Sequence, residues 1–216
     1  MRKMSEEKNT MILDYMNALV NLYGILPKEK LLDIYNDHQG ESLTRADLER
    51  VIEEEKEHIT SYLYIYLKDE YLVSISIMVS DNFEQELKMS EGKPYYVPDE
   101  EELLKYNDLY YFEENQEYRK LLKFLTEISG DREEAERMAR ELKSYCGSLR
   151  SLMNVPYFVA REEVLSDLGD DELEQLKELV ADLAYTTRMT QHNGYMPLQV
   201  GGLGLDEYQS FGCASN

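Results

Sequence analysis

The feature that most constrains the fold is the order of periodicities along the first 80 residues. Three stretches with apolar residues at helical spacing are followed by two stretches, Ile59–Lys68 and Leu72–Val79, in which apolar residues alternate with others. The segment KDEY, residues 68–71, joins the alternating stretches and is short enough for a hairpin turn. This order predicts three helices followed by a β-hairpin.

The three helical stretches carry boundary signals. The first runs from about Met11 to Tyr23, and the second, PKEKLLDIYN, opens on Pro27, a residue that suits the first turn of a helix. In the third, residues 42–58, Thr44 is spaced as an N-cap, and Asp47 makes a capping-box-like pair with it. Three helices and a hairpin in this order are the topology of a winged-helix domain.

The rest of the chain is predicted to be helical. Residues 81–98 break the periodicity and are predicted to be a linker, and residues 99–200 contain amphipathic stretches typical of a helical bundle. The tail, residues 201–216, has four glycines and no period. The predicted fold class is mainly α with a small β-hairpin (α+β), with a winged-helix-like part at residues 1–80 followed by a helical bundle part.

The charge balance argues against a nucleic-acid partner. The chain has 44 acidic and 23 basic residues, a formal net charge of −21, and no basic run. Binding a duplex depends on clustered Lys and Arg that neutralise phosphates. A winged helix inserts its third helix into DNA, but here acids outnumber bases along that helix. A DNA-binding regulator stays an alternative, with Arg45, Arg50 and Lys68 as the DNA-reading candidates.

The tyrosines are candidates for an interaction surface. The chain has 18 Tyr and no Trp, and Tyr62, Tyr64 and Tyr66 are predicted to share one face of the first hairpin strand. Tyrosine suits interfaces because it buries a large ring while keeping a hydroxyl for hydrogen bonding. Two interpretations are open: the helical part of the same chain covers this face, or another molecule does.

Motifs for catalysis and metal binding are missing from the sequence. The three histidines are far apart, Cys146 lies on an apolar helical stripe that favours burial, and Cys213 belongs to the tail. The segment GGLGLD at 201–206 lacks the Lys-Ser/Thr pair of a P-loop. Acid runs at 53–55 and 99–102 are predicted to be solvated helix surfaces. We therefore predict no enzyme, no cofactor and no metal, with an enzyme that uses a carboxylate site as an alternative.

Three segments resemble one protein family. NLYGILPKEKLLDIYN, YYVPDEEELLKYND and TRMTQHNGYMP are similar to successive segments of a family of mostly uncharacterised proteins from Gram-positive bacteria, which often end in a zinc-binding SEC-C motif. The third segment matches the family's motif loop at Thr187, Arg188, Met189, Gly194 and Pro197. It departs at Thr190, His192 and Met196, and the zinc motif is missing. The resemblance implies a winged-helix-like front and a helical rear, and no established reaction.

These observations give one main hypothesis and two alternatives. No apolar run approaches the roughly 18 residues of a membrane span, and the N-terminus passes directly into an amphipathic stretch, so we expect a cytoplasmic protein without a membrane partner. The main hypothesis is a non-enzymatic acidic protein that acts through protein–protein interaction, with a basic protein or by self-association. The alternatives are a winged-helix transcriptional regulator and an enzyme with an unfamiliar carboxylate site.

Overall fold

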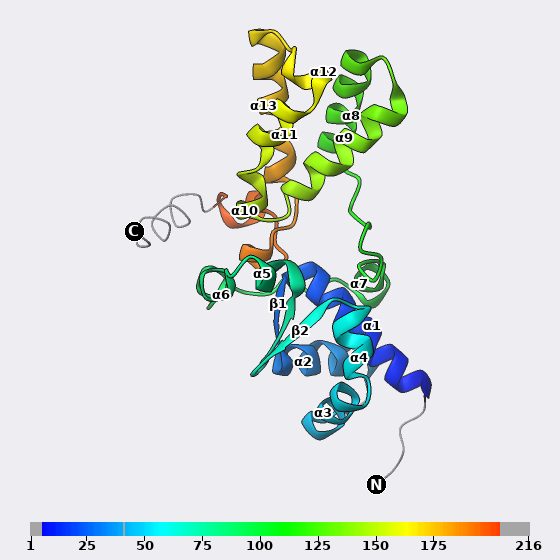
Figure 1. Ribbon diagram of the computed structural model, residues 1–216. Helices are drawn as coiled ribbons and strands as arrows, with labels where there is room; N and C mark the ends of the chain where they lie inside the picture. Colours follow the sequence, from blue (N-terminus) through cyan, green and yellow to red (C-terminus); the bar gives the residue numbers. More distant parts are fainter. Residues whose placement is uncertain (1–5, 41, 204–216) are drawn as a thin grey trace. The chain divides into compact units, whose positions relative to one another are not determined.

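The computed structural model describes residues 6–40 and 42–203 (Figure 1). The fold is mainly helical with a small antiparallel sheet, as the sequence predicts. The chain divides into two compact units, residues 1–112 and 113–216, and each is described by itself. Within the described residues, no helix combines the length and the hydropathy that crossing a bilayer requires.

The first unit alternates helices with short strands. In chain order its elements are α1 (Glu6–Tyr23), β1 (Ile25–Pro27), α2 (Lys28–Gln39), α3 (Arg45–Glu54), α4 (Lys56–Ser61), β2 (Ile65–Lys68), β3 (Tyr71–Ser74), α5 (Ile75–Val79), α6 (Phe83–Ser90) and α7 (Glu100–Lys105). Each strand is only three or four residues long, because a helix begins or ends within a few residues of it.

Helix α3 begins where its capping signal predicts. The amide of Asp47 donates to Thr44 Oγ1 at 3.2 Å, and the Thr44 hydroxyl donates to the Asp47 carboxylate at 2.7 Å. The predicted single helix over residues 42–58 is interrupted, however. Glu55 leaves helical geometry at φ −108° and ψ 18°, and α4 starts at the next residue.

The sheet has the strand order β1-β3-β2, and both pairs are antiparallel. The central strand is β3, where Leu72 lies opposite Leu26 of β1 on one side and Leu67 of β2 on the other. The sequence analysis missed β1, because a three-residue strand that ends in Pro27 shows no period.

The two faces of the sheet are covered differently. The inner face joins α1 and α2 in the main core through Leu26, Ile65 and Leu72. On the outer face, Ile25 of β1 and Val73 of β3 form a second cluster with Ile77 of α5 and Phe83 of α6. Helices α5 and α6 therefore contribute the side chains that pack on β1 and β3 from the outer side.

The predicted hairpin strands were too long. Residues 59–61 belong to α4 and residues 75–79 form α5, which leaves Ile65–Lys68 and Tyr71–Ser74 as strands. Over so few residues, alternation cannot be distinguished from one or two helical turns. Ile77 illustrates the error, because it is buried from a helix, against Phe83, and not from a strand.

The predicted linker at 81–98 was also wrong in extent. Helix α6 lies inside it, and the chain beyond α6 packs on α1. The Tyr23 hydroxyl donates to the Tyr96 carbonyl at 2.6 Å, and the Asn21 amide donates to the Tyr106 carbonyl at 2.8 Å. These bonds hold residues 96–106 to the first unit, which ends at Phe112 and not near residue 80.

The second unit is helical throughout its described residues. Its elements are α8 (Gln116–Ser129), α9 (Arg132–Tyr145), α10 (Leu149–Leu152), α11 (Val155–Arg161), α12 (Glu163–Ser166), α13 (Asp170–Tyr185), the 3-10 helix η1 (Thr190–His192) and α14 (Pro197–Val200). Helices α8 and α9 lie side by side (Figure 1). Their buried side chains and those of α13 include Leu121, Leu125, Met138, Leu142 and Leu183.

Two turns set the ends of α9. Gly130, at φ +68°, ends α8 in the left-handed region that glycine adopts readily, and Asp131 then caps α9 by accepting from the Glu133 amide at 2.8 Å. Helix α9 stops at Tyr145, and Ser148 caps the separate helix α10. Of the predicted tail, residues 204–216, which include Cys213, lie outside the described residues.

A core substitution tests the sheet packing. We expect Leu72→Ala to lower the free energy of unfolding by about 2–5 kcal/mol, because Leu72 is fully buried at the centre of the inner sheet face. Val79→Ala is the control, since that side chain is 80% exposed and its loss should change stability by less than about 0.5 kcal/mol. Urea unfolding followed by circular dichroism measures both, and equal stabilities would contradict the packing.

Candidate interaction surface

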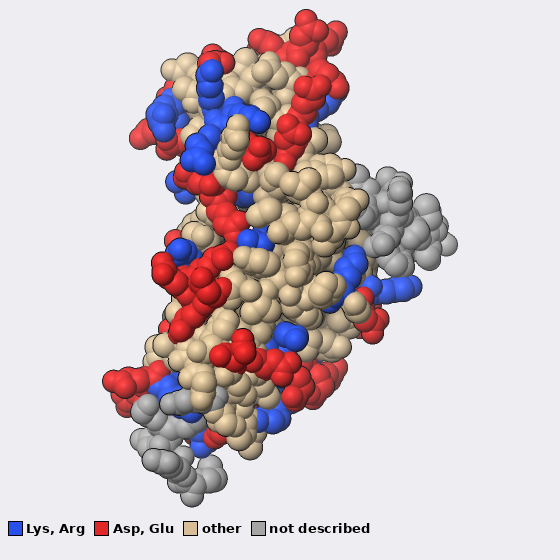
Figure 2. All heavy atoms as spheres, turned by 180° about the vertical axis from the view of Figure 1, so that it is seen from behind, with Lys and Arg blue, Asp and Glu red and all other residues tan. Residues whose placement is uncertain are grey.

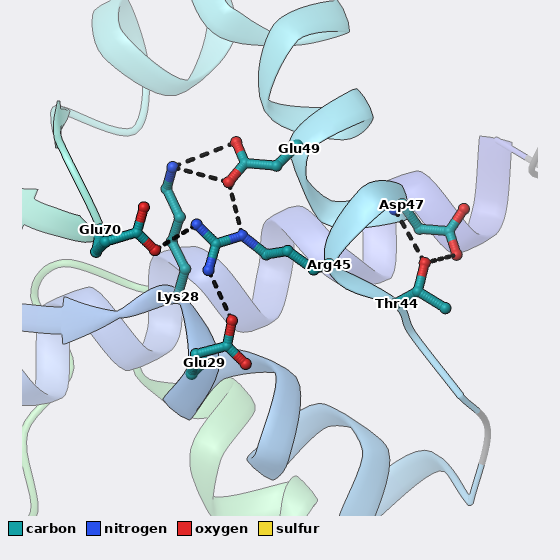
Figure 3. Close-up of polar contacts among 7 residues, drawn as sticks. All are labelled: Lys28, Glu29, Thr44, Arg45, Asp47, Glu49 and Glu70. Carbon is teal, nitrogen blue, oxygen red and sulfur yellow. Dashed lines mark hydrogen bonds and ion pairs between the residues drawn. The ribbon is translucent and has the colours of Figure 1, made fainter.

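Arg45, the first DNA-reading candidate, is surrounded by carboxylates (Figure 3). Its Nη1 donates to Glu29 of α2 at 2.7 Å, and its Nη2 donates to Glu70 of the hairpin turn at 2.5 Å. Its Nε donates to Glu49, one turn further along α3, at 2.7 Å. The bond to Glu70, followed by those to Glu29 and Glu49, raises the pKa of Arg45 above its usual range, although burial opposes the rise.

A second cation completes this group. Lys28 Nζ donates to both carboxylate oxygens of Glu49, at 3.0 and 3.2 Å. Burial would raise the pKa of Glu49, but the hydrogen bonds from Lys28 and Arg45 lower it below its usual value. We call these five residues the Arg45 cluster: Lys28, Glu29, Arg45, Glu49 and Glu70. With two cations against three carboxylates, the cluster presents no surplus positive charge.

The other two DNA-reading candidates are paired as well. Arg50 donates to Asp47 at 3.1 Å. Lys68 Nζ lies 4.3 Å from the ring centroid of Phe83 and 3.7 Å from Glu84, so α6 holds it on the outer face of the sheet. Figure 2 shows one face of the chain, where acidic side chains lie next to basic ones. The three candidates thus each serve a contact within the fold.

The tyrosine candidates are exposed. Tyr62 is 70% exposed, Tyr64 55% and Tyr66 50%. They do not share one strand face as predicted, because Tyr62 caps the end of α4 and Tyr64 precedes β2. Tyr66 lies opposite Val73 and so points to the outer face of the sheet, where it is half exposed. We call Tyr62, Tyr64 and Tyr66 the tyrosine edge.

Tyr64 has an unusual backbone. Its φ of +55° lies in the left-handed region, which costs a bulky L-residue on the order of 1 kcal/mol. Its carbonyl nevertheless accepts from the Ile75 amide at 2.9 Å, so that the ladder between β2 and β3 continues one pair beyond the strands. A glycine would relieve the strain, and the tyrosine therefore occupies this position at a cost to stability.

The motif loop that carries the family resemblance is built into the second unit. The Thr187 hydroxyl donates to the Leu183 carbonyl at 2.6 Å and accepts from Lys143 Nζ at 2.8 Å. Arg188 Nε donates to Glu113 at 2.7 Å, and its Nη1 donates to the Gly194 carbonyl at 3.3 Å. Gly194 itself has φ +83°. These contacts give Thr187, Arg188 and Gly194 structural roles.

The polar residues at the centre of the motif loop are buried. Gln191 Oε1 accepts from the Leu149 amide at 3.2 Å, and Asn193 turns the chain at φ +48°. Gln191, His192 and Asn193 are all buried, and Pro197, also buried, starts α14. The departures of Thr190 and His192 from the family motif fall on η1, in the middle of this buried turn.

Lys143 is the titratable group that the sequence analysis missed. It lies one helical turn after Ala139 on the buried stripe of α9 and is 6% exposed. Burial lowers its pKa from 10.5 to about 8. Cys146 follows on the same stripe, fully buried as predicted, and burial raises the pKa of its thiol to about 12. A protonated thiol is a poor nucleophile and a poor metal ligand.

The acid runs are partly used by the fold. Asp99 caps α7 by accepting from the Glu102 amide at 2.8 Å, and Glu102 accepts from the Tyr96 hydroxyl at 2.8 Å. Glu53 and Glu54 are exposed. Among the described residues, His, Cys, Asp and Glu side chains form no group of three or more suited to a metal ion.

We compared the chain with protein-family models, with curated proteins and with solved structures, and none of the three comparisons gave a match. The resemblance to the Gram-positive family stays a prediction.

The Arg45 cluster predicts the outcome of a DNA titration. We expect a fluorescent duplex of random sequence to show no saturable binding at about 0.15 M salt, because Arg45 would have to exchange three carboxylates for phosphate. The double variant Arg45→Gln, Arg50→Gln should give the same anisotropy trace. Tight binding that weakens steeply with salt and is lost in the double variant would contradict the cluster's role.

Lys143 predicts a pH dependence of stability. Between pH 8 and 10.5 the unfolded chain keeps a proton on Lys143 that the folded chain has lost, so stability rises with pH through this window. We expect the wild type to gain about 2 kcal/mol relative to Lys143→Met between pH 7 and 9.5. Urea unfolding of both proteins measures the difference, in which the tyrosine titrations cancel. A difference that does not change with pH would contradict the assignment.

Proposed function

We propose that this chain is a non-catalytic acidic protein that acts through protein–protein interaction, with the tyrosine edge as its contact surface. The observation that carries the proposal is the exposure of three neighbouring tyrosines, each at least half accessible, at the border of a small sheet. A soluble chain rarely leaves several large rings together at the surface unless they meet another molecule.

The chemistry of the edge suits a protein partner. Residues 59–67 contain no charged side chain, in a chain of which 31% of residues are charged. Tyrosine rings add contact area at a low entropic cost, and their hydroxyls satisfy polar groups across an interface. The strained backbone at Tyr64 supports the same proposal, since strain of this kind gathers at functional sites.

We further propose that the first unit is a winged-helix-like scaffold used for protein contact and not for reading DNA. The order α1-β1-α2-α3-α4-β2-β3, with β3 between the other strands and the short helix α4 following α3 directly, supports the winged-helix-like assignment. In DNA-binding members of that fold, α3 is the helix that enters the groove. Here the start of α3 is tied by Arg45 to Glu29 and Glu70, and the net charge of −21 opposes a polyanion.

Affinity capture from a host-cell lysate, with and without nuclease treatment, tests the proposal. The test variant is Tyr62→Ser, Tyr64→Gly, Tyr66→Thr, in which glycine suits the positive φ and threonine suits the strand. The control variant replaces three exposed tyrosines elsewhere, Tyr110→Ser, Tyr157→Ser and Tyr185→Ser.

We expect the wild type and the control variant to retain the same proteins, and the test variant to lose them while its melting temperature stays within a few degrees of the wild-type value. Equal capture of the same proteins by the wild type, the test variant and the control variant would contradict the proposal. Capture of DNA that disappears with nuclease would favour the transcriptional regulator instead.

A further inference from the structure

The segment just before the tyrosine edge carries carboxylates that the fold does not use. Residues 53–57, which span the junction of α3 and α4, contain four Glu and one Lys, a formal charge of −3, and we call them the acidic junction. Glu53, Glu54 and Glu57 are exposed, and none of their carboxylates forms an ion pair with another described residue. The carboxylates of the Arg45 cluster, by contrast, each bind a cation.

Helix α4 connects the acidic junction to the tyrosine edge. Ile59 of α4 is buried in the main core, so Glu57 and Ser61, two positions to either side of it, point away from the core. Tyr62 follows Ser61 at the end of the helix, and its ring stacks on that of His58 with 5.5 Å between the ring centroids. Helix α4 packs on β2, along which the tyrosine edge continues (Figure 1). The exposed carboxylates and the exposed rings therefore adjoin.

A guanidinium is the group that suits rings and carboxylates together. It is planar, stacks on aromatic faces and donates two parallel hydrogen bonds to a carboxylate. The second unit holds an arginine in this way: the guanidinium carbon of Arg161 lies 5.3 Å from the ring centroid of Phe158, and Nη2 donates to Glu141 at 2.7 Å. A lysine ammonium is compact and strongly hydrated, so it gains less from the same surroundings.

The charge of the partner follows from the charge of this surface. Residues 59–67 contain no base, and Lys68, the next residue, is held by the ring of Phe83 and by Glu84. A nucleic acid would bring phosphates against the acidic junction, and a second copy of this chain would bring a further charge of −21. A cationic segment of another protein is the occupant that gains attraction here.

We propose that the tyrosine edge and the acidic junction together bind an arginine-rich segment of another protein. Its guanidinium groups stack on the rings of Tyr62, Tyr64 and Tyr66 and pair with the neighbouring carboxylates. This rests on the proposed function and adds the chemistry of the partner. The rings supply contact area, and the carboxylates supply attraction that salt screens.

Fluorescence anisotropy of a labelled peptide of alternating Arg and Gly, titrated with the full chain at about 0.15 M salt, tests the inference. The same peptide with Lys in place of each Arg has equal charge and measures the preference for guanidinium. The tyrosine variant and its control are those described for the capture experiment. A charge variant, Glu53→Gln, Glu54→Gln and Glu57→Gln, is matched by Glu133→Gln, Glu163→Gln and Glu178→Gln, which remove the same charge from exposed positions of the second unit.

We expect the wild type to bind the arginine peptide with a dissociation constant in the micromolar range, and the lysine peptide at least about threefold more weakly. The tyrosine variant and the charge variant should each bind the arginine peptide at least about tenfold more weakly, while both controls stay within about twofold of wild type. The charge variant changes only exposed side chains, so its loss of binding cannot be ascribed to a disturbed core.

A wild-type chain that does not bind the arginine peptide overturns the inference. Equal weakening in the charge variant and its control would indicate attraction by the net charge alone and would also overturn it, as would equal affinity for the two peptides. Capture of lysate proteins that needs the tyrosine edge but is unchanged in the charge variant leaves the proposed function intact and removes only the arginine-rich partner. Capture that is unchanged in the tyrosine variant removes both.

Discussion

The alternation of hydrogen bonds along β3 is the constraint on which the rest of the first unit depends. One set of alternate residues bonds to β1 and the other set to β2, so the central strand has no backbone group left over. Helix α4 ends just before β2 and helix α5 begins just after β3, which confines each strand of the hairpin to four residues. The exposed tyrosines Tyr62, Tyr64 and Tyr66 lie where the chain passes from α4 into β2.

Electrostatics separates this surface from the helix that a winged-helix protein would insert into DNA. The guanidinium of Arg45 links α2, α3 and the hairpin turn through three carboxylates. Ion pairs of this exposure add little stability, but a guanidinium with three fixed partners sets the orientation of the elements that carry them. The positive charge of α3 is consequently used to assemble the fold, and the segment that bears Tyr62, Tyr64 and Tyr66, residues 59–67, carries no charged side chain.

Local signals in the sequence were sufficient for some features and not for others. The Thr44 cap and the burial of Cys146 follow from the pattern of residues within one or two helical turns, and both are present. The spacing of Arg45 and Glu49 would have indicated their ion pair.

The features that depend on residues far apart in the sequence could not be predicted from local patterns. Glu29 and Glu70 approach Arg45 only through the tertiary fold, and the packing of residues 96–106 on α1 depends on Tyr23 and Asn21, far away in the sequence. The bounds of the short strands were predicted wrongly for another reason, since four residues do not define a period. Lys143 could have been identified by its place on an apolar stripe.

Amide hydrogen exchange at the end of β3, measured by NMR on the full chain, tests the central constraint most directly. We expect slow exchange at Ser74, whose amide donates to the Gly24 carbonyl, and at Ile75, whose amide donates to the Tyr64 carbonyl on the other side. Fast exchange at either amide would contradict a central strand whose backbone bonds are divided between β1 and β2.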